Sequence, residues 1–235
     1  MAAVILEARG LTKRFGGLTA VDGVDFDLNR GEIHALIGPN GAGKTTFVSL
    51  LCGRIEPTSG TIRFEGRDIT GMPAHARVRL GIAYTFQITS IFPRLTAFGN
   101  VELAAQRLGA AGLAQRTEAA LERVGLGPEA RDRAGDLSYG HQRLVEIAMG
   151  LALEPRLLIL DEPTQGLANA EIERFKDVVR ALVPETTILL IEHNMDLVMS
   201  LAERITVLNF GAKLAEGTPD EIRANPAVQA AYLGG

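Results

Sequence analysis

The chain has 235 residues, enough for one large domain, or for one domain with an inserted lobe, around a substantial buried core. Its net charge of −4 leaves no excess of basic residues for a nucleic-acid surface, so we expect no nucleic-acid partner. The single cysteine, Cys52, excludes an internal disulfide framework and a cysteine-based zinc cluster. The N-terminal apolar run is too short for a secretory signal, and no window reaches the ~18 uninterrupted apolar residues of a membrane span. We therefore expect a soluble protein whose membrane role would come through a partner.

The first third of the chain predicts β structure. Strand patterns occur at residues 4–9, 24–28, 33–38 and 61–66. In the second of these, Val24, Phe26 and Leu28 alternate with aspartates, which is typical of a strand with one buried face. Residues 29–32, "NRGE", predict the tight turn that joins two of the strands.

From about Thr96 to Leu153 the pattern is helical, with apolar residues spaced by three and four. Beyond this segment strands and helices alternate, with strands predicted at 156–162, 186–193 and 204–210 and helices at 169–183 and 195–203. Such alternation with nearly continuous apolar strands is typical of a parallel sheet covered on both faces. A last helix is predicted from Thr218, the N-cap, with Pro219 at its first position and Glu221 three residues after the cap.

These patterns predict an α/β fold in a single domain, residues 1–235. We expect a mainly parallel core and an N-terminal antiparallel β layer from residues 1–87 and 154–235. A helical subdomain is expected as an insertion at about 88–153.

A phosphate-binding loop follows the apolar strand 33–37. Residues 38–45, "GPNGAGKT", fit the pattern G-x-x-x-x-G-K-[ST] in full and precede a helical stretch. The glycines allow backbone N–H groups to point at phosphate oxygens, Lys44 neutralises the β- and γ-phosphates, and the Thr45 hydroxyl ligates Mg²⁺. The alternative is a glycine-rich turn that precedes a lysine by chance, and the strand–loop–helix context argues against it. The predicted ATP-binding residues of this phosphate-loop NTPase core are Gly38, Pro39, Asn40, Gly41, Ala42, Gly43, Lys44, Thr45 and Thr46.

Two carboxylates, Asp161 and Glu162, end the apolar strand predicted at 156–162. In phosphate-loop ATPases an Asp at such a strand end holds the Mg²⁺ shell, usually through water. Glu162 is predicted to polarise the attacking water as a general base. Such pairs also cap helices, but the phosphate loop upstream favours the catalytic role.

Three more residues are candidates for the same site. His193 follows a parallel strand at the edge where ligands gather, and we expect it to contact the γ-phosphate and hold Glu162 and the water in register. Gln87 follows the strand predicted at 81–86, and its amide can reach Mg²⁺ or the water. A solitary His or Gln is more often structural, and only the context favours these roles. Phe15 can stack on a base, although an aromatic residue in a β layer is by default part of the core.

The stretch 136–142, "DLSYGHQ", has the features of a helix start that holds an anion: a Ser, a Gly and several free backbone N–H groups. The loop at 38–45 already forms a complete phosphate site. This second anion site therefore needs a separate explanation.

The motifs, in this order, resemble those of the ATP-binding subunits of ABC transporters, over nearly the whole chain. The resemblance rests on the phosphate loop at 38–45, Gln87, "LSYGHQ" at 137–142, "LLILDEP" at 157–163 and His193. It implies that Phe15 stacks on adenine. It also implies that Ser138 and Gly140 bind the γ-phosphate of ATP held by the other subunit of a head-to-tail dimer, which closes on two ATP molecules and reopens after hydrolysis.

Three residues depart from the family's usual pattern. Tyr139 and His141 replace the Gly and Gln that are commonest in the signature, and binding through Ser138 and backbone N–H groups would tolerate both changes. Ala168 stands where many members have an Asp, in the loop that touches the opposite site. That change concerns the coupling between the two sites rather than ATP binding.

Within the family, residues 81–101, 137–153 and 191–219 look most like the subunits of branched-chain amino acid importers, and urea and amide importers share the pattern. This resemblance implies a second ATPase subunit, identical or different, together with polytopic membrane permease subunits. It also implies a periplasmic or extracellular substrate-binding protein and a cytoplasmic location on the inner face of the cell membrane.

Two alternatives are the ATPase of a lipopolysaccharide exporter and a soluble ABC ATPase of translation or DNA maintenance. The soluble class generally has two cassettes in one chain or a long coiled-coil insertion, and this sequence has neither. Co-purification with polytopic membrane proteins would separate both transporter types from the soluble class. Uptake of labelled leucine would separate an importer from an exporter.

Overall fold

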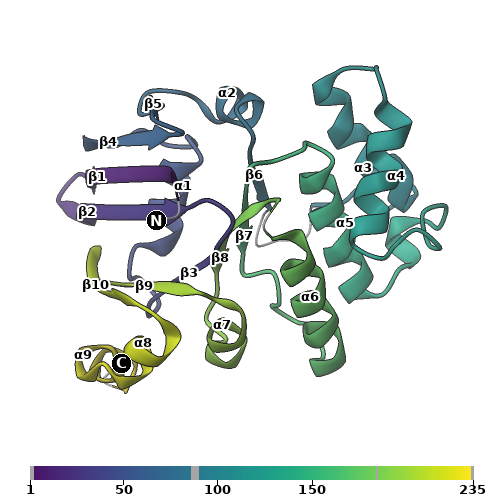
Figure 1. Cartoon of the computed structure of the whole chain (residues 1–235). Helices are drawn as coiled ribbons and strands as arrows, with labels where there is room; N and C mark the ends of the chain where they lie inside the picture. Colours follow the sequence, from purple (N-terminus) through teal and green to yellow (C-terminus); the bar gives the residue numbers. More distant parts are fainter. Residues whose placement is uncertain (1–2, 86–89, 184, 234–235) are drawn as a thin grey trace. The chain divides into compact units, whose positions relative to one another are not determined.

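The computed structural model describes residues 3–85, 90–183 and 185–233. The chain divides into two compact units: residues 1–80 with 187–235 form unit 1, and residues 81–186 form unit 2. The predicted α/β fold is confirmed, because parallel strand pairs, an antiparallel sheet and helices are all present (Figure 1). The limits predicted for an inserted helical subdomain, 88–153, stay a prediction.

An antiparallel sheet forms the N-terminal part of unit 1, as predicted. Its strands, in spatial order, are β2 (Leu18–Asn29), β1 (Val4–Phe15), β4 (Ser59–Phe64) and β5 (Arg67–Asp68). Val24, Phe26 and Leu28 are buried and Asp25 is exposed, which confirms the alternation predicted for β2. β1 continues past its predicted end at residue 9, because pairing with β2 sustains it as far as Phe15.

Unit 1 also holds parallel strands built from apolar runs. β3 (Ile33–Ile37) pairs in parallel with β8 (Thr187–Ile191) and with β9 (Arg204–Asn209). Every residue of β3 and β8 is buried. The sequence pattern did not predict β10 (Ala212–Gly217), which pairs antiparallel with β9. The connecting turn has positive φ at both Phe210 and Gly211, 45° and 81°, which is the backbone geometry of a tight hairpin.

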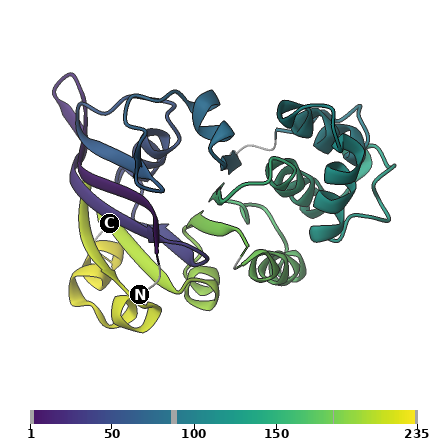
Figure 2. The same ribbon diagram turned by 45° about the horizontal axis from the view of Figure 1, so that its top comes forward.

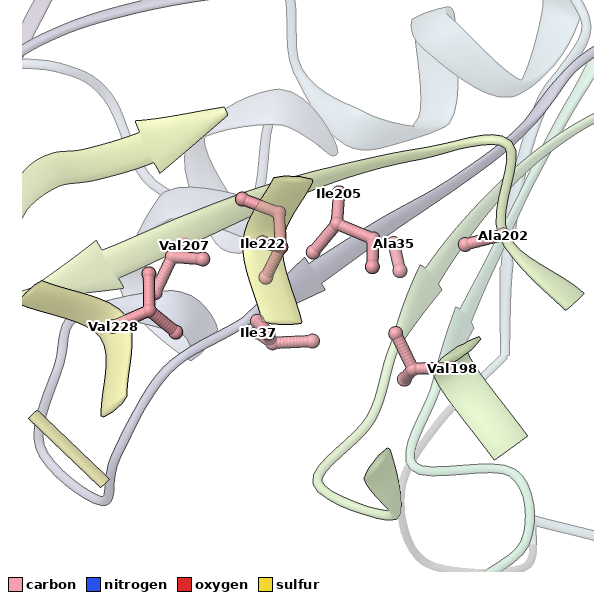
Figure 3. Close-up of a cluster of buried hydrophobic side chains, with 8 residues drawn as sticks. All are labelled: Ala35, Ile37, Val198, Ala202, Ile205, Val207, Ile222 and Val228. Carbon is pink, nitrogen blue, oxygen red and sulfur yellow. The ribbon is translucent and has the colours of Figure 1, made fainter. Parts of the chain in front are cut away.

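The helices of unit 1, in the described residues, are α1 (Lys44–Leu51), α2 (Ala74–Arg79), α7 (Met195–Leu201), α8 (Pro219–Ala224) and α9 (Pro226–Leu233). One buried apolar cluster joins α7, α8 and α9 to the parallel strands β3 and β9. The cluster, which lies between strands and helices in Figure 3, consists of Ala35, Ile37, Val198, Ala202, Ile205, Val207, Ile222 and Val228. Because Ile37 directly precedes the phosphate loop, the cluster fixes the end of the strand that carries the loop.

The capping box predicted for the last part of the chain is confirmed. Thr218 Oγ1 accepts a hydrogen bond from the N–H of Glu221 at 3.4 Å, and the Glu221 carboxylate accepts one from the N–H of Thr218 at 2.8 Å. Pro219 occupies the first turn of α8. The start of this helix is therefore determined locally.

Arg77 is the largest fully buried side chain in the described residues, with 1% of its surface exposed. It lies in α2, and its guanidinium donates to five backbone carbonyls, those of Leu50, Leu51, Ile69, Thr70 and Met72, at 2.7–3.0 Å. Burial lowers its pKa to about 10, so the side chain stays charged at neutral pH. Since two of these carbonyls end α1, Arg77 supports the helix that follows the phosphate loop.

Replacing Arg77 with Ala should lower the free energy of unfolding by roughly 3 kcal/mol or more, because it leaves five buried carbonyls without their charged donor. Arg79→Ala, an exposed substitution in the same helix, is the control and should change stability by less than about 0.5 kcal/mol. Chemical denaturation of both variants measures the difference. Equal midpoints would contradict a supporting role for Arg77.

Unit 2 contains the parallel pair β6 (Ile82–Thr85) and β7 (Leu157–Asp161) and the helices expected between Thr96 and Leu153. Its helices are α3 (Ala97–Ala105), α4 (Leu113–Arg123), α5 (Tyr139–Leu151) and α6 (Asn169–Leu182), with 3₁₀ turns at 106–108 and 134–136. α3, α4 and α5 pack against one another as one cluster (Figure 2). Within the described ranges, no helix has the length and apolarity that a membrane span requires.

Candidate functional site

The phosphate loop connects the end of β3 to the start of α1 through backbone that only glycine can adopt. Gly38 and Gly43 have φ values of 154° and 97°. A Cβ on Gly38 would overlap the carbonyl oxygen of Leu208, and a Cβ on Gly43 would overlap that of Ala20. The backbones of β9 and β2 therefore lie directly against the loop and leave no room for a side chain at these two glycines.

Lys44 lies across this loop. Only 9% of its surface is exposed, and its Nζ donates to the carbonyls of Gly38 at 2.6 Å and Pro39 at 3.1 Å. The first turn of α1 has no acidic residue, and its N-cap has no side-chain hydrogen bond. The positive helix end, Lys44 and the adjacent Thr45 and Thr46 hydroxyls together suit an anion. This donor set fits the phosphates of a nucleotide, for which Lys44 would exchange its carbonyl acceptors.

His193 and the phosphate loop follow neighbouring parallel strands. Leu36 of β3 lies opposite Ile191 of β8, so the two following segments begin at the same sheet edge. The His193 side chain is 59% exposed. Buried Glu192 accepts hydrogen bonds from the N–H groups of His193 at 3.1 Å and Asn194 at 3.3 Å, and so fixes the backbone beneath the imidazole.

Phe15 is not a core residue, although an aromatic in a β layer would be one by default. It ends β1 and is 49% exposed. Lys13 Nζ lies 5.1 Å from the centroid of its ring. An exposed aromatic face beside a cation suits the base of an anionic nucleotide.

In unit 2, Asp161 is buried at the end of β7. The hydroxyl of Tyr84, from β6, donates to Asp161 Oδ2 at 2.6 Å. The parallel register places Tyr84 opposite Ile159, so that its hydroxyl reaches the end of the neighbouring strand. This contact orients the carboxylate. Sequence reasoning missed Tyr84, whose only signal was a polar tip in an otherwise apolar strand.

Glu162 has a strained backbone. Its φ is 46°, in the left-handed region that side chains other than Gly, Asn and Asp rarely adopt. Such a conformation costs on the order of 1–3 kcal/mol and is concentrated at functional sites. The carbonyl of Glu162 accepts a hydrogen bond from the N–H of Gln165 at 3.3 Å, which closes a turn directly after the strand. This turn redirects the chain immediately after the two predicted carboxylates.

The described part of the chain contains no group of three or more His, Cys, Asp or Glu side chains that could hold a metal ion. Mg²⁺ at phosphate-transfer sites commonly uses one or two protein ligands together with phosphate and water oxygens. Thr45 in unit 1 and Asp161 in unit 2 offer oxygen ligands of that type. A threonine hydroxyl and an aspartate carboxylate are each oxygen donors of the kind that Mg²⁺ prefers.

Gln87 lies outside the described residues. The chain resumes at Ser90, whose N–H donates to Glu146 Oε1 of α5. Glu146 also accepts a hydrogen bond from Arg143 at 2.9 Å, and burial raises its pKa against the opposing effect of these contacts. A buried carboxylate thus anchors the connection between β6 and α3 to the helix that starts at 139.

The predicted helix start at 136–142 is confirmed, because Ser138 is the N-cap of α5 and accepts from the N–H of His141 at 3.2 Å. The expectation that its N–H groups are free is wrong for two of them. His141 donates to Ser138, and Gly140 donates to Glu171 Oε1 at 3.2 Å. Glu171, which lies in α6, was not among the predicted site residues.

Comparison with known proteins identifies the family of this chain. Residues 21–165 match a family model described as ABC transporter, and residues 212–235 match one described as branched-chain amino acid ATP-binding cassette transporter. The chain belongs to the ABC transporter family. This cassette is 44% identical to the high-affinity branched-chain amino acid transport ATP-binding protein BraF of Pseudomonas aeruginosa, over 100% of the chain and 99% of BraF. It is 41% identical to LivG of Escherichia coli K12, with the same coverage.

Solved structures of ATP-binding cassettes share the fold over almost the full length of this cassette. The ADP conformation of MJ1267, an ATP-binding cassette of an ABC transporter, is 28% identical, with a TM-score of 0.89 and 99% of each chain covered. A nucleotide-free cassette from an ABC transporter is 27% identical, with a TM-score of 0.90, and the match covers 99% of this chain and 100% of that one. The predicted family and fold are confirmed.

Proposed function

We propose that this cassette hydrolyses ATP with Mg²⁺ to drive an importer of branched-chain or related amino acids. The observation that carries the proposal is the phosphate loop, whose glycines allow its tight curve and in which Lys44 Nζ donates to the carbonyls of Gly38 and Pro39. The relatives that match this chain over its full length are named for high-affinity transport of branched-chain amino acids.

The phosphate loop and Lys44 bind the triphosphate, and Phe15 stacks on the base. Thr45 and Asp161 would hold Mg²⁺, Asp161 through water, and the ion would supply positive charge against the phosphates of ATP. Tyr84 keeps the Asp161 carboxylate in one orientation.

Glu162 accepts a proton from the attacking water. His193 contacts the γ-phosphate and helps to position the attacking water next to Glu162. Gln87 contacts the metal or the water. Phosphoryl transfer asks mainly for positioning and charge compensation, which these polar groups supply.

Ser138 and Gly140 bind the γ-phosphate of ATP held by a second ATPase subunit, identical or different. The dimer closes on ATP because the closed state binds the nucleotide with both halves of the site. Polytopic permease subunits on the inner face of the cell membrane receive this motion, and a periplasmic or extracellular binding protein delivers the amino acid.

The test is uptake of labelled leucine in a strain that lacks this chain, compared with the strain complemented by wild type or by Lys44→Ala. Wild type should restore uptake and Lys44→Ala should not. Pull-down from native membranes should recover polytopic permease subunits. Unchanged uptake in the deletion strain, together with export defects, would overturn the importer assignment.

Phe15→Ala should weaken ATP binding about 5- to 150-fold, because stacking of a base on an aromatic ring contributes ~1–3 kcal/mol. Leu18→Ala is the control, since Leu18 is exposed and pairs with Phe15 across the same hairpin. Calorimetric titration of both variants with ATP measures the change. Wild-type affinity in Phe15→Ala would remove this residue from the base site.

A further inference from the structure

Glu171 of α6 binds two separate segments of unit 2 with one carboxylate. Its Oε1 accepts from the N–H of Gly140 at 3.2 Å, and its Oε2 accepts from the N–H of Ala168 at 3.0 Å. Gly140 lies in the signature turn, which we define as residues 138–141. Ala168 ends the loop 163–168, which directly follows Glu162.

The position of this carboxylate depends on glycine at 140. Gly140 is buried, and a Cβ there would overlap Oε1 and the carboxyl carbon of Glu171. The carboxylate therefore occupies the space that a side chain at 140 would fill. In the described part of the chain, Glu171 has no ion-pair partner, so its charge is stabilised by the two N–H groups.

Contacts at the surface join the signature turn to residues of the segment 166–174. The Tyr139 ring lies against Gly166, where a Cβ would be 3.1 Å from Tyr139 Cε1. Arg174 Nη1 lies 2.7 Å from His141 Nε2. Tyr139 and His141, the two departures from the usual signature, thus both contact the segment 166–174.

A cavity of about 140 Å³ lies behind these contacts. Its lining includes Gly140, Leu144, Leu167, Glu171 and Phe175. Apolar side chains do not fill the space between the first turn of α5 and the start of α6. The polar contacts of Glu171 and Arg174, together with the Tyr139 ring on Gly166, hold the signature turn against this segment.

We propose that Glu171 is a positioning residue that holds the Gly140 N–H and must release it when the γ-phosphate of the partner's ATP arrives. The inference rests on the proposed function, in which that N–H donates a hydrogen bond to the γ-phosphate. One N–H cannot donate a good hydrogen bond to the Glu171 carboxylate and to the γ-phosphate at the same time, and the two negative charges repel each other. Closure by ATP therefore includes the displacement of the Glu171 carboxylate.

Displacement has a second effect, because the same carboxylate holds the N–H of Ala168. When Oε1 leaves Gly140, the side chain turns, and the acceptor of Ala168 moves with it. The loop 163–168 begins one residue after Glu162. Arrival of the partner's phosphate at the signature turn is thereby transmitted to the loop that directly follows Glu162, the general base of this chain.

The experiment measures ATP-dependent dimerisation in a Glu162→Gln background, with Glu171→Gln added. Gln keeps the size and one acceptor oxygen but removes the charge, so half-maximal dimerisation should need about tenfold less ATP. A residue that merely supports the signature turn would give the opposite sign. Equal or weaker dimerisation of Glu171→Gln overturns the proposal.

Two control variants accompany the Glu171→Gln experiment. Glu173→Gln removes a charge from an exposed carboxylate of the same helix and should leave the ATP requirement unchanged. Ser138→Ala in the same background tests the proposed function itself, because it should abolish dimerisation. If Ser138→Ala dimerises normally, the proposed contact of Ser138 with the partner's ATP is wrong. If Ser138→Ala behaves as expected but Glu171→Gln does not tighten dimerisation, the proposed displacement of Glu171 is wrong. Thermal unfolding of Glu171→Gln within a few degrees of wild type shows that the variant is folded.

Discussion

A Glu162→Gln variant should bind ATP, form a stable dimer and hydrolyse the nucleotide at least ~100-fold more slowly than wild type. Loss of a general base typically costs 10²–10⁴ in rate, and Gln keeps the size and hydrogen-bonding reach of Glu without accepting a proton. Size-exclusion chromatography with ATP should show the dimer, and phosphate release should measure turnover.

Glu154→Gln is a matched control for this variant. Glu154 is exposed and also has a left-handed backbone, with φ of 49°, so the substitution tests whether Gln is tolerated in that conformation. Its turnover should equal that of wild type. If Glu162→Gln also hydrolyses ATP at the wild-type rate, Glu162 is not the general base.

Ser138→Ala should abolish ATP-dependent dimerisation while ATP affinity of the single chain stays within about twofold of wild type. The hydroxyl has two roles: it caps α5 by accepting from His141 N–H, and in the proposed dimer it donates to the partner's phosphate. Calorimetry measures ATP binding, and chromatography in the Glu162→Gln background measures dimerisation.

Loss of the cap alone should lower stability by ~1 kcal/mol. Thr218→Ala removes a comparable N-cap from α8 and separates the two effects. It should reduce stability by a similar amount and leave dimerisation intact. Parallel loss of ATP binding and dimerisation in Ser138→Ala would contradict a contact with the partner's nucleotide.

Much of the site was predictable because its signals are contiguous. The phosphate loop occupies residues 38–45 and lies between a buried strand and a helix, as its pattern requires. Asp161 ends one strand of uninterrupted buried residues, and His193 comes shortly after another. The caps at Ser138 and Thr218 use bonds that span three residues. Gln87 lies outside the described residues and stays a prediction.

The sequence by itself determined most of the strands and helices, the position of the glycine-rich loop between β3 and α1, and the family to which the chain belongs. Those properties depend on short-range hydrogen bonds and on which face of an element is apolar, and both leave a local pattern. Only the tertiary structure decided that β10 forms, that Arg77 caps the end of α1, and that Glu171 holds Gly140. Each of these contacts joins segments whose distance and register are set by the surrounding strands and helices, and no local pattern encodes that distance.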